Sequence, residues 1–190
     1  ISWRRDIHEH PELSNREFRT SKLVADHLKS LGMEVQTGVA HTGVVGILRG
    51  GKPGPVLALR ADMDGLPVVE KTGLAYASKQ LGEYEGREVG VMHACGHDVH
   101  TTCLLGAIRI LDELKDEFEG TIRCIFQPGE ERLPGGASIM IKNGVLQNPS
   151  VEKILGQHVM PLIDAGKVGF RSGLYMASAD EIHIKVIGKG

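Results

Sequence analysis

The length, composition and charge of this chain are those of a folded protein, and they exclude several classes of function. Its 190 residues suffice for one well-cored domain or for one domain and the start of another, and its 41% apolar and 24% charged residues show no disorder bias. The net charge of -2 comes from interspersed residues, which predicts no surface for nucleic acid or anionic lipid, and apolar runs such as Val56–Leu59 are too short to span a bilayer.

The first predicted elements are a helix and two strands. The segment from Ser14 to Glu17 has the pattern of a helix capping box, and the apolar residues after it recur at helical spacing, which predicts a helix over residues 15–31. Two β-branched runs follow, Gly43–Leu48 and Pro55–Ala61, with glycine and proline between them. The second run is apolar on both faces, as is typical of a strand inside a covered sheet.

The rest of the chain is predicted to alternate strands with helices. Residues 63–94 are expected to be irregular apart from a short hairpin, and a helix capped by Asp98 is expected to run until Gly120. The remaining predicted elements are strands at 121–126, 153–156, 168–171 and 181–187 and a short helix at 136–143. This order predicts an α/β fold with a largely parallel sheet that is covered by helices on both faces.

A second domain is expected near the end of the chain. The last predicted strand alternates polar and apolar residues, which is typical of an antiparallel sheet with one wet face. We therefore expect residues 1–178 to form the first domain and residues 179–190 to form the first strand of another.

The amino terminus and the cysteines favour a cytoplasmic protein. Residues 1–11 are charged from residue 4 onward and lack the apolar core of a secretory signal. The spacings of 8 and 21 between Cys95, Cys103 and Cys124 fit no disulfide framework, so free thiols in a reducing compartment are expected. Cys103 and Cys124 lie in apolar runs and are expected to be small buried side chains.

Four clusters of residues that can bind metal or transfer protons lie at or after predicted strands. They are Asp62–Asp64, Cys95–Asp98, Gln127–Glu131 and Gln157–His158. Ligands of an open α/β sheet bind beyond the carboxyl ends of its strands, so clusters that are distant in sequence are expected to converge there. This convergence predicts a metal site.

The side chains in these clusters suit metal-dependent hydrolysis of an amide. Cys95 and His97 offer a thiolate and an imidazole with only a glycine between them, a pair that transition metals favour. Glu130 and Glu131 would repel each other in one cleft unless a cation or a shared proton compensates. One of them can bind metal, while the other takes a proton from the attacking water and delivers it to the leaving nitrogen.

Each cluster taken alone also has a simpler interpretation. His158 could be a hydrogen-bonded structural histidine, and Glu130 and Glu131 could be a solvated surface pair. Asp62 and Asp64 could be a turn residue and a helix cap. The clusters together are harder to explain in this way.

Other catalytic classes find less support in the sequence. Cys95 could act as a thiol nucleophile with His97 or His100 as its base, but that interpretation leaves the carboxylate pairs unused. The sequence contains no Gly-x-Ser-x-Gly elbow, no phosphate-binding loop ending in Lys-Ser/Thr and no dinucleotide fingerprint between a strand and a helix.

Four long segments carry a specific combination of motifs. They are Arg4–His8 with His10–Leu13, Leu59–Pro67, Met92–His100 and Phe126–Glu131. In this order they resemble the aminoacylase and carboxypeptidase G type of metallopeptidase. The resemblance is closest to its amidohydrolase branch, which contains hippurate hydrolases, bacterial N-acyl-amino-acid hydrolases and plant auxin-conjugate hydrolases.

The resemblance implies a Zn-exopeptidase-like catalytic domain with two divalent metal ions, which could be Mn, Zn, Ni or Co. The implied metal ligands are Cys95, His97, Glu131 and His158. Glu130 is implied to be the general base and acid, and Asp64 is implied to orient a metal ligand.

The chain departs from the wider family in motif and in length. Where other members have a His-x-Asp metal motif and a bridging aspartate, this chain has Asp62-Met63-Asp64 and the cluster around Cys95, which leaves the identity of the metal open. Related enzymes insert a lid or dimerisation domain and then return to supply a last metal-binding histidine. This chain stops where that insertion would begin, so we expect that residues 1–190 alone are inactive or that they omit residues of a longer protein. The resemblance implies a homodimer formed through the missing domain.

The favoured function is hydrolysis of N-acyl or N-aroyl amino acids by metal-activated water, with Glu130 as the base. A deacetylase of N-acetylated diamino acids and a dipeptidase are alternatives of the same class. A non-catalytic metal-binding or interaction module is an alternative of another class, although a purely structural site has no use for the proton shuttle Glu130. The expected partner is a small N-acyl amino acid. Neither nucleic acid nor a membrane is expected to be a partner.

Overall fold

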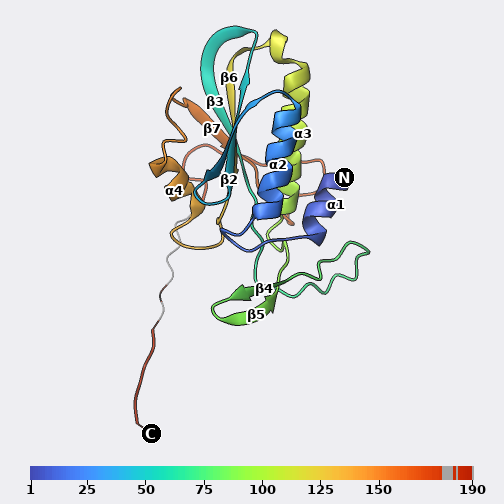
Figure 1. Cartoon of the computed structure of the whole chain (residues 1–190), viewed down its shortest axis with the longest axis vertical. Coiled ribbons are helices and arrows are strands. Elements are labelled where there is room, and N and C mark those ends of the chain that lie inside the picture. The colour runs from blue at the N-terminus through green and yellow to red at the C-terminus, as the bar shows by residue number, and fades with distance from the viewer. Residues whose placement is uncertain (177–181, 183, 190) are drawn as a thin grey trace. The chain divides into compact units, whose positions relative to one another are not determined.

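The computed structural model (Figure 1) describes residues 1–176, 182 and 184–189. The chain divides into two units. Ile1–Val159 is the first unit, and it holds every helix and strand of the described residues. Met160–Gly190 is the second. No helix in the described part of the chain is both long enough and apolar enough to cross a bilayer.

The first unit is built on one mixed sheet. Its elements are α1 (Ser2–Glu9), α2 (Phe18–Ser30), β1 (Glu34–Val39), β2 (Gly43–Arg49), β3 (Lys52–Asp62), β4 (Leu81–Tyr84), β5 (Arg87–Gly90), α3 (His97–Glu113), the 3₁₀ turn η1 (Lys115–Glu117), β6 (Glu119–Gln127), α4 (Gly136–Lys142) and β7 (Lys153–Gly156). Five strands pair in the order β1-β2-β6-β3-β7, and only β2 runs against the others. The predicted α/β fold with a largely parallel sheet is therefore confirmed, and β4 and β5 form the expected hairpin.

Helices cover both faces of this sheet, as predicted. Successive side chains of a strand point to opposite faces. On β6, Cys124 and Phe126 belong to a core cluster with residues of α2 and α3, whereas Ile125 belongs to a second cluster with Met140 of α4. Figure 1 shows α2 and α3 on one side of the sheet and α4 on the other. Strand β3 lies between β6 and β7, in the interior position predicted for it.

The predicted capping box does not cap α2. The helix begins at Phe18, and the backbone N–H groups of Arg19 and Thr20 in its first turn donate to the carboxylate of Glu12 at 2.8 and 2.9 Å. The side chains of Ser14 and Glu17 bond to other parts of the fold instead. The predicted capping box is wrong because the carboxylate of Glu12, which lies outside the predicted box, accepts from the free donors of the helix.

The helix predicted from Asp98 to Gly120 has different ends and a different cap. Gly96, with φ of 87°, precedes its first residue, and the helix ends at Glu113 before the short turn η1. The carboxylate of Asp98 does not cap the helix, because it pairs with Arg4 at 2.9 Å and with His8 at 2.8 Å. The ion pair with Arg4 and the hydrogen bond with His8 attach α1 to the first turn of α3.

Two further predictions are corrected by the structure. Cys103 is exposed rather than buried, because it lies about 200° around α3 from the buried Thr101, whereas Cys124 is fully buried as expected. The predicted strand at 168–171 is absent, since its residues have no paired strand among those described and Phe170 is 90% exposed. Of the predicted strand at 181–187, residues 181 and 183 lie outside the described residues, and the others are not in a strand.

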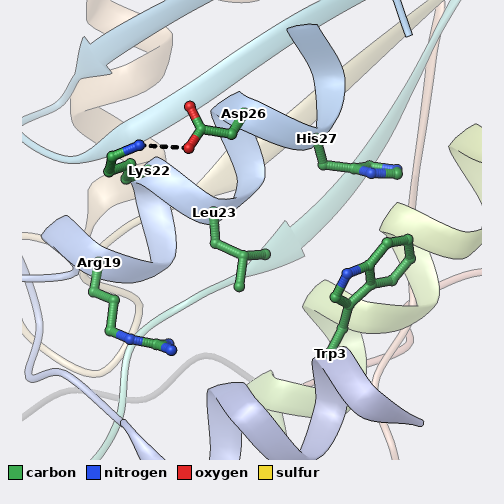
Figure 2. A pocket seen from close by; sticks show the side chains of 6 residues that line it. All are labelled: Trp3, Arg19, Lys22, Leu23, Asp26 and His27. Atoms are coloured by element: carbon green, nitrogen blue, oxygen red, sulfur yellow. Dashed lines mark hydrogen bonds and ion pairs between the residues drawn. The ribbon is translucent and has the colours of Figure 1, made fainter. Parts of the chain in front are cut away.

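A shallow groove lies where α1 packs against α2 (Figure 2). The ring of Trp3 meets the ring of His27 edge-on, with 4.5 Å between centroids, and Leu23 lies beside them. Charged residues at the groove pair within the fold: Lys22 with Asp26 at 2.5 Å, and Arg19 with Asp6 at 2.7 Å. The groove therefore offers packing between helices and little free charge.

The packing of His27 predicts a pH-dependent contribution to stability. Burial lowers the pKa of His27 below its ordinary value of 6.5. As the pH falls below about 6.5, the unfolded chain binds a proton that the folded chain resists, so the stability that is complete above this pH is progressively lost. Urea unfolding at pH 7.5 and 5.5 should show a smaller difference for His27→Phe, which keeps the ring but cannot titrate. An unchanged difference would contradict this.

Candidate metal centre

The sheet brings three of the four predicted clusters to one edge. Asp62 is the last residue of β3, Gln127 the last of β6 and Gly156 the last of β7. These three strands are parallel and adjacent, so the segments that follow them leave the sheet at the same edge. The fourth cluster joins them in the turn that leads into α3.

His97 lies at the centre of the converged residues. Its Nε2 atom is 3.6 Å from an oxygen of Asp62, 3.7 Å from Glu131 Oε1 and 3.9 Å from Glu130 Oε2. Three groups have potential ligand atoms within 4.8 Å of one another: Cys95, His97 and His158; Asp62, His97 and His100; and His97, Glu130 and Glu131. All residues predicted as metal ligands or as the base therefore lie together.

Unpartnered buried atoms show that a divalent cation would fit here. Among the described residues, His97 Nε2 and Glu131 Oε1 have no hydrogen-bond partner although both atoms are buried. Such atoms cost about 1–3 kcal/mol each when they are left unsatisfied. Sulfur, imidazole and carboxylate donors together suit zinc, nickel, cobalt or manganese, so the donor set agrees with the geometry.

Hydrogen bonds fix the ring of His97 with one nitrogen free. The Nδ1 atom lies 2.8 Å from the backbone oxygen of Asp64, which can only accept, so Nδ1 carries a proton and, in the neutral ring, Nε2 has the lone pair. Burial alone would lower the pKa of His97, but the carboxylate of Asp64, 3.3 Å from Nδ1, and the charge of Asp62 raise it overall. The Asp64 carboxylate also accepts from the Glu131 N–H at 3.0 Å. Asp64 thus holds two of the predicted ligands in place.

The sulfur of Cys95 has a histidine neighbour that was not considered as its base from sequence. It lies 3.4 Å from His158 Nε2, and a nitrogen of His97 also lies within 4.8 Å of it. Burial, and then the charges of Glu131 and Glu130, raise the pKa of the Cys95 thiol to about 12. A thiol is reactive only as the thiolate, which a nearby divalent cation would stabilise.

The two adjacent glutamates differ in exposure. The side chain of Glu130 is 40% exposed and that of Glu131 is 20% exposed. Burial and the charge of Glu131 raise the pKa of Glu130. A raised carboxyl pKa at the open side of the site suits proton exchange with a reactant.

The sequence analysis did not predict the hydrogen bonds that link Asp62, His100 and Val159 beside His158. His100 Nδ1 bonds to Asp62 at 2.7 Å, and its Nε2 accepts from the backbone N–H of Val159 at 2.8 Å. Burial opposes ionisation of Asp62, but its bond to His100 and the Arg60 guanidinium outweigh it and lower the pKa of Asp62 to about 2. His100 lies one helical turn after His97, a spacing that indicates a shared face of α3.

Comparison with known proteins places the chain in one family. The sequence profile described as peptidase family M20/M25/M40 matches residues 58–188. The chain belongs to peptidase family M20/M25/M40. The predicted membership in the aminoacylase and carboxypeptidase group of metallopeptidases is thus confirmed.

Named relatives in this family include hydrolases and one solved dinuclear enzyme. An N-acyl-L-amino acid amidohydrolase of Geobacillus stearothermophilus is 43% identical over 190 residues, which are 100% of this chain and 49% of the relative. Thermostable carboxypeptidase 1 of Saccharolobus solfataricus is 49% identical over 192 residues, covering 100% of this chain and 46% of the relative. The YXEP protein of Bacillus subtilis, a dinuclear metal binding M20 peptidase, superposes with a TM-score of 0.76 at 42% identity over 85% of this chain and 43% of its own. The chain spans about half the length of these relatives.

Proposed function

We propose that this chain supplies the metal centre and the proton shuttle of a hydrolase that cleaves the amide of N-acyl or N-aroyl amino acids. The observation that carries the proposal is the convergence of His97 Nε2 and Glu131 Oε1, both buried and unpartnered among the described residues, with the exposed carboxylate of Glu130 beside them. The names of the amidohydrolase and carboxypeptidase relatives support hydrolysis of an amide next to an amino acid.

The proposed ligands of two divalent metal ions are Cys95, His97, Glu131 and His158. Bound metal would supply Lewis-acid activation of the water and the carbonyl. The backbone oxygen of Asp64 favours the tautomer of His97 that leaves Nε2 available for metal. The side-chain carboxylate of Asp64 accepts a hydrogen bond from the backbone N–H of Glu131. The metals are manganese, zinc, nickel or cobalt by the chemistry of these donors.

Glu130 is the proposed general base and acid. Its carboxylate takes a proton from water as the oxygen attacks the amide carbonyl, and it returns that proton to the nitrogen as the carbon–nitrogen bond breaks. The products are a carboxylate and a free amino acid. The raised pKa of Glu130 brings its two protonation states closer in energy, which suits both transfers.

The exposure of Glu130 favours an enzyme over a non-catalytic metal module. Among the described residues its carboxylate makes no hydrogen bond, whereas the neighbouring Glu131 is held through its backbone by Asp64. A structural staple would need the ligands and not a free carboxylate beside them. N-acetylated diamino acids and dipeptides are alternative substrates for the same chemistry.

The proposal is tested with the full-length natural protein and a panel of N-acyl amino acids. Metal analysis should find two divalent ions per chain, and the assay should detect release of free amino acid. Removal of metal with a chelator should abolish turnover, and adding back manganese, zinc, nickel or cobalt should restore it and identify the metal. Metal without turnover on any substrate would favour the binding module, and a protein that binds no metal would refute the site.

A further inference from the structure

The carboxylate of Glu17 is a buried acidic group outside the proposed metal ligands. Glu17 is 0% exposed, and three donors of the protein bond to its carboxylate. Oε1 accepts from the backbone N–H of Asn15 at 2.9 Å and from that of Gly129 at 2.8 Å, while Oε2 accepts from the hydroxyl of Thr42. The carboxylate therefore ties the segment before α2 to the loop that follows β6.

This attachment occurs one residue before the proposed base. Gly129 directly precedes Glu130 and Glu131 in sequence, and its φ of 56° lies in the left-handed region. A Cβ atom at Gly129 would lie 2.6 Å from Asn15 Oδ1, so the side chain of Asn15 closes against this backbone. The loop is thus held at Gly129 by its hydrogen bond to Glu17 and by the close contact of its backbone with Asn15.

The same short segment reaches the other side of the base as well. The hydroxyl of Ser14 donates to Asp64 Oδ2 at 2.6 Å, and the same oxygen accepts from the backbone N–H of Glu131 at 3.0 Å. Residues 14–17 therefore act on the loop directly at Gly129 and, through Asp64, at Glu131. Glu130 lies between the two points.

Burying the carboxylate of Glu17 costs free energy, and helix capping does not compensate for this cost. Burial raises the pKa of Glu17, and the bonds from Thr42 and Gly129 oppose that rise. A buried carboxylate is unfavourable unless hydrogen bonds compensate it. Glu17 makes no capping bond to α2, and of its three donors one belongs to the loop that carries the base.

We propose that Glu17 is a positioning residue for the hydrolysis, which fixes the backbone at Gly129 and thereby the placement of the Glu130 carboxylate and of Glu131. The proposal rests on the proposed function for its kinetic part. An error of about 1 Å in the position of a catalytic group can lower the rate by about 100-fold, so loss of the hydrogen bond at Gly129 should strongly reduce turnover.

Two variants of matched size separate positioning from mere folding. Glu17→Gln keeps an oxygen that can accept from Asn15 and Gly129, and its amide can donate to the Thr42 hydroxyl. Glu17→Met keeps the volume but removes every acceptor. Glu88→Met serves as the control, because it makes the same chemical change at an exposed position of β5.

The experiment measures kcat, KM and the absorption spectrum of bound cobalt(II) in the full-length protein. Glu17→Met should lower kcat by about 10- to 100-fold with KM changed less than about threefold, and it should alter the cobalt spectrum because Glu131 is displaced. Glu17→Gln and Glu88→Met should stay within about threefold of wild type in kcat and keep its spectrum.

Two results would overturn the proposal: a folded Glu17→Met protein with wild-type kcat and spectrum, or a Gln variant as impaired as the Met variant. If circular dichroism shows that Glu17→Met is unfolded, Glu17→Asp decides by the same criteria, because it withdraws the carboxylate from Gly129 by one methylene. Absence of wild-type turnover on the panel would reject the proposed function alone, and the cobalt spectra would still test whether Glu17 positions Glu131.

Discussion

Glu130→Gln is expected to lower kcat by about 10²- to 10⁴-fold while the protein keeps its metal. Glutamine has the same size as glutamate but cannot accept the proton of the attacking water. Because the side chain is 40% exposed and is not among the proposed ligands, its replacement should disturb neither the fold nor the metal ions.

The measurement combines steady-state kinetics with metal analysis on the same preparation. Glu88→Gln is a matched control, since it makes the same chemical change at an exposed position of β5 and should leave kcat unchanged. Turnover by Glu130→Gln at the wild-type rate would show that another group moves the proton. Loss of metal together with activity would show instead that Glu130 is itself a ligand.

His97→Ala is expected to remove metal binding and turnover together. His97 is the one residue shared by all three groups of potential ligands in the described part of the chain, and its Nε2 lies within 4 Å of three carboxylates. Without the imidazole, the three groups lose the one ligand that they share. The three carboxylates would then repel one another with no metal bound between them. Metal analysis after dialysis should therefore find the site depleted.

A second histidine variant distinguishes this loss from a general effect. His41 is exposed in the turn between β1 and β2 with φ of 81°, a conformation that asparagine tolerates, so His41→Asn should retain metal and activity. Circular dichroism must show that His97→Ala is folded, because the ring is 1% exposed and its removal leaves a cavity. A folded variant with two bound metal ions would contradict the proposed centre.

The sequence by itself determined the central elements of the fold and the place of the site. The β-branched runs predicted β2 and β3, and the apolar period predicted the body of α3. These predictions hold because the local spacing of apolar residues in each segment matches the face that is buried. β1 was missed because four of its six residues are exposed, so it has no apolar period to read. The four clusters were expected to converge at one edge of the sheet. The structure brings three of them there at the ends of parallel strands, and the fourth joins them from the turn before α3.

Only the tertiary structure decided which partners the polar side chains take. From sequence, Ser14 and Glu17 predict a helix cap and Asp98 predicts another, yet these groups bond to Asp64, Gly129 and His8. Local spacing records which hydrogen bonds a segment could make with itself. It does not record the donors that folding brings from 50 to 112 residues away, and a buried carboxylate takes whichever donors compensate its desolvation.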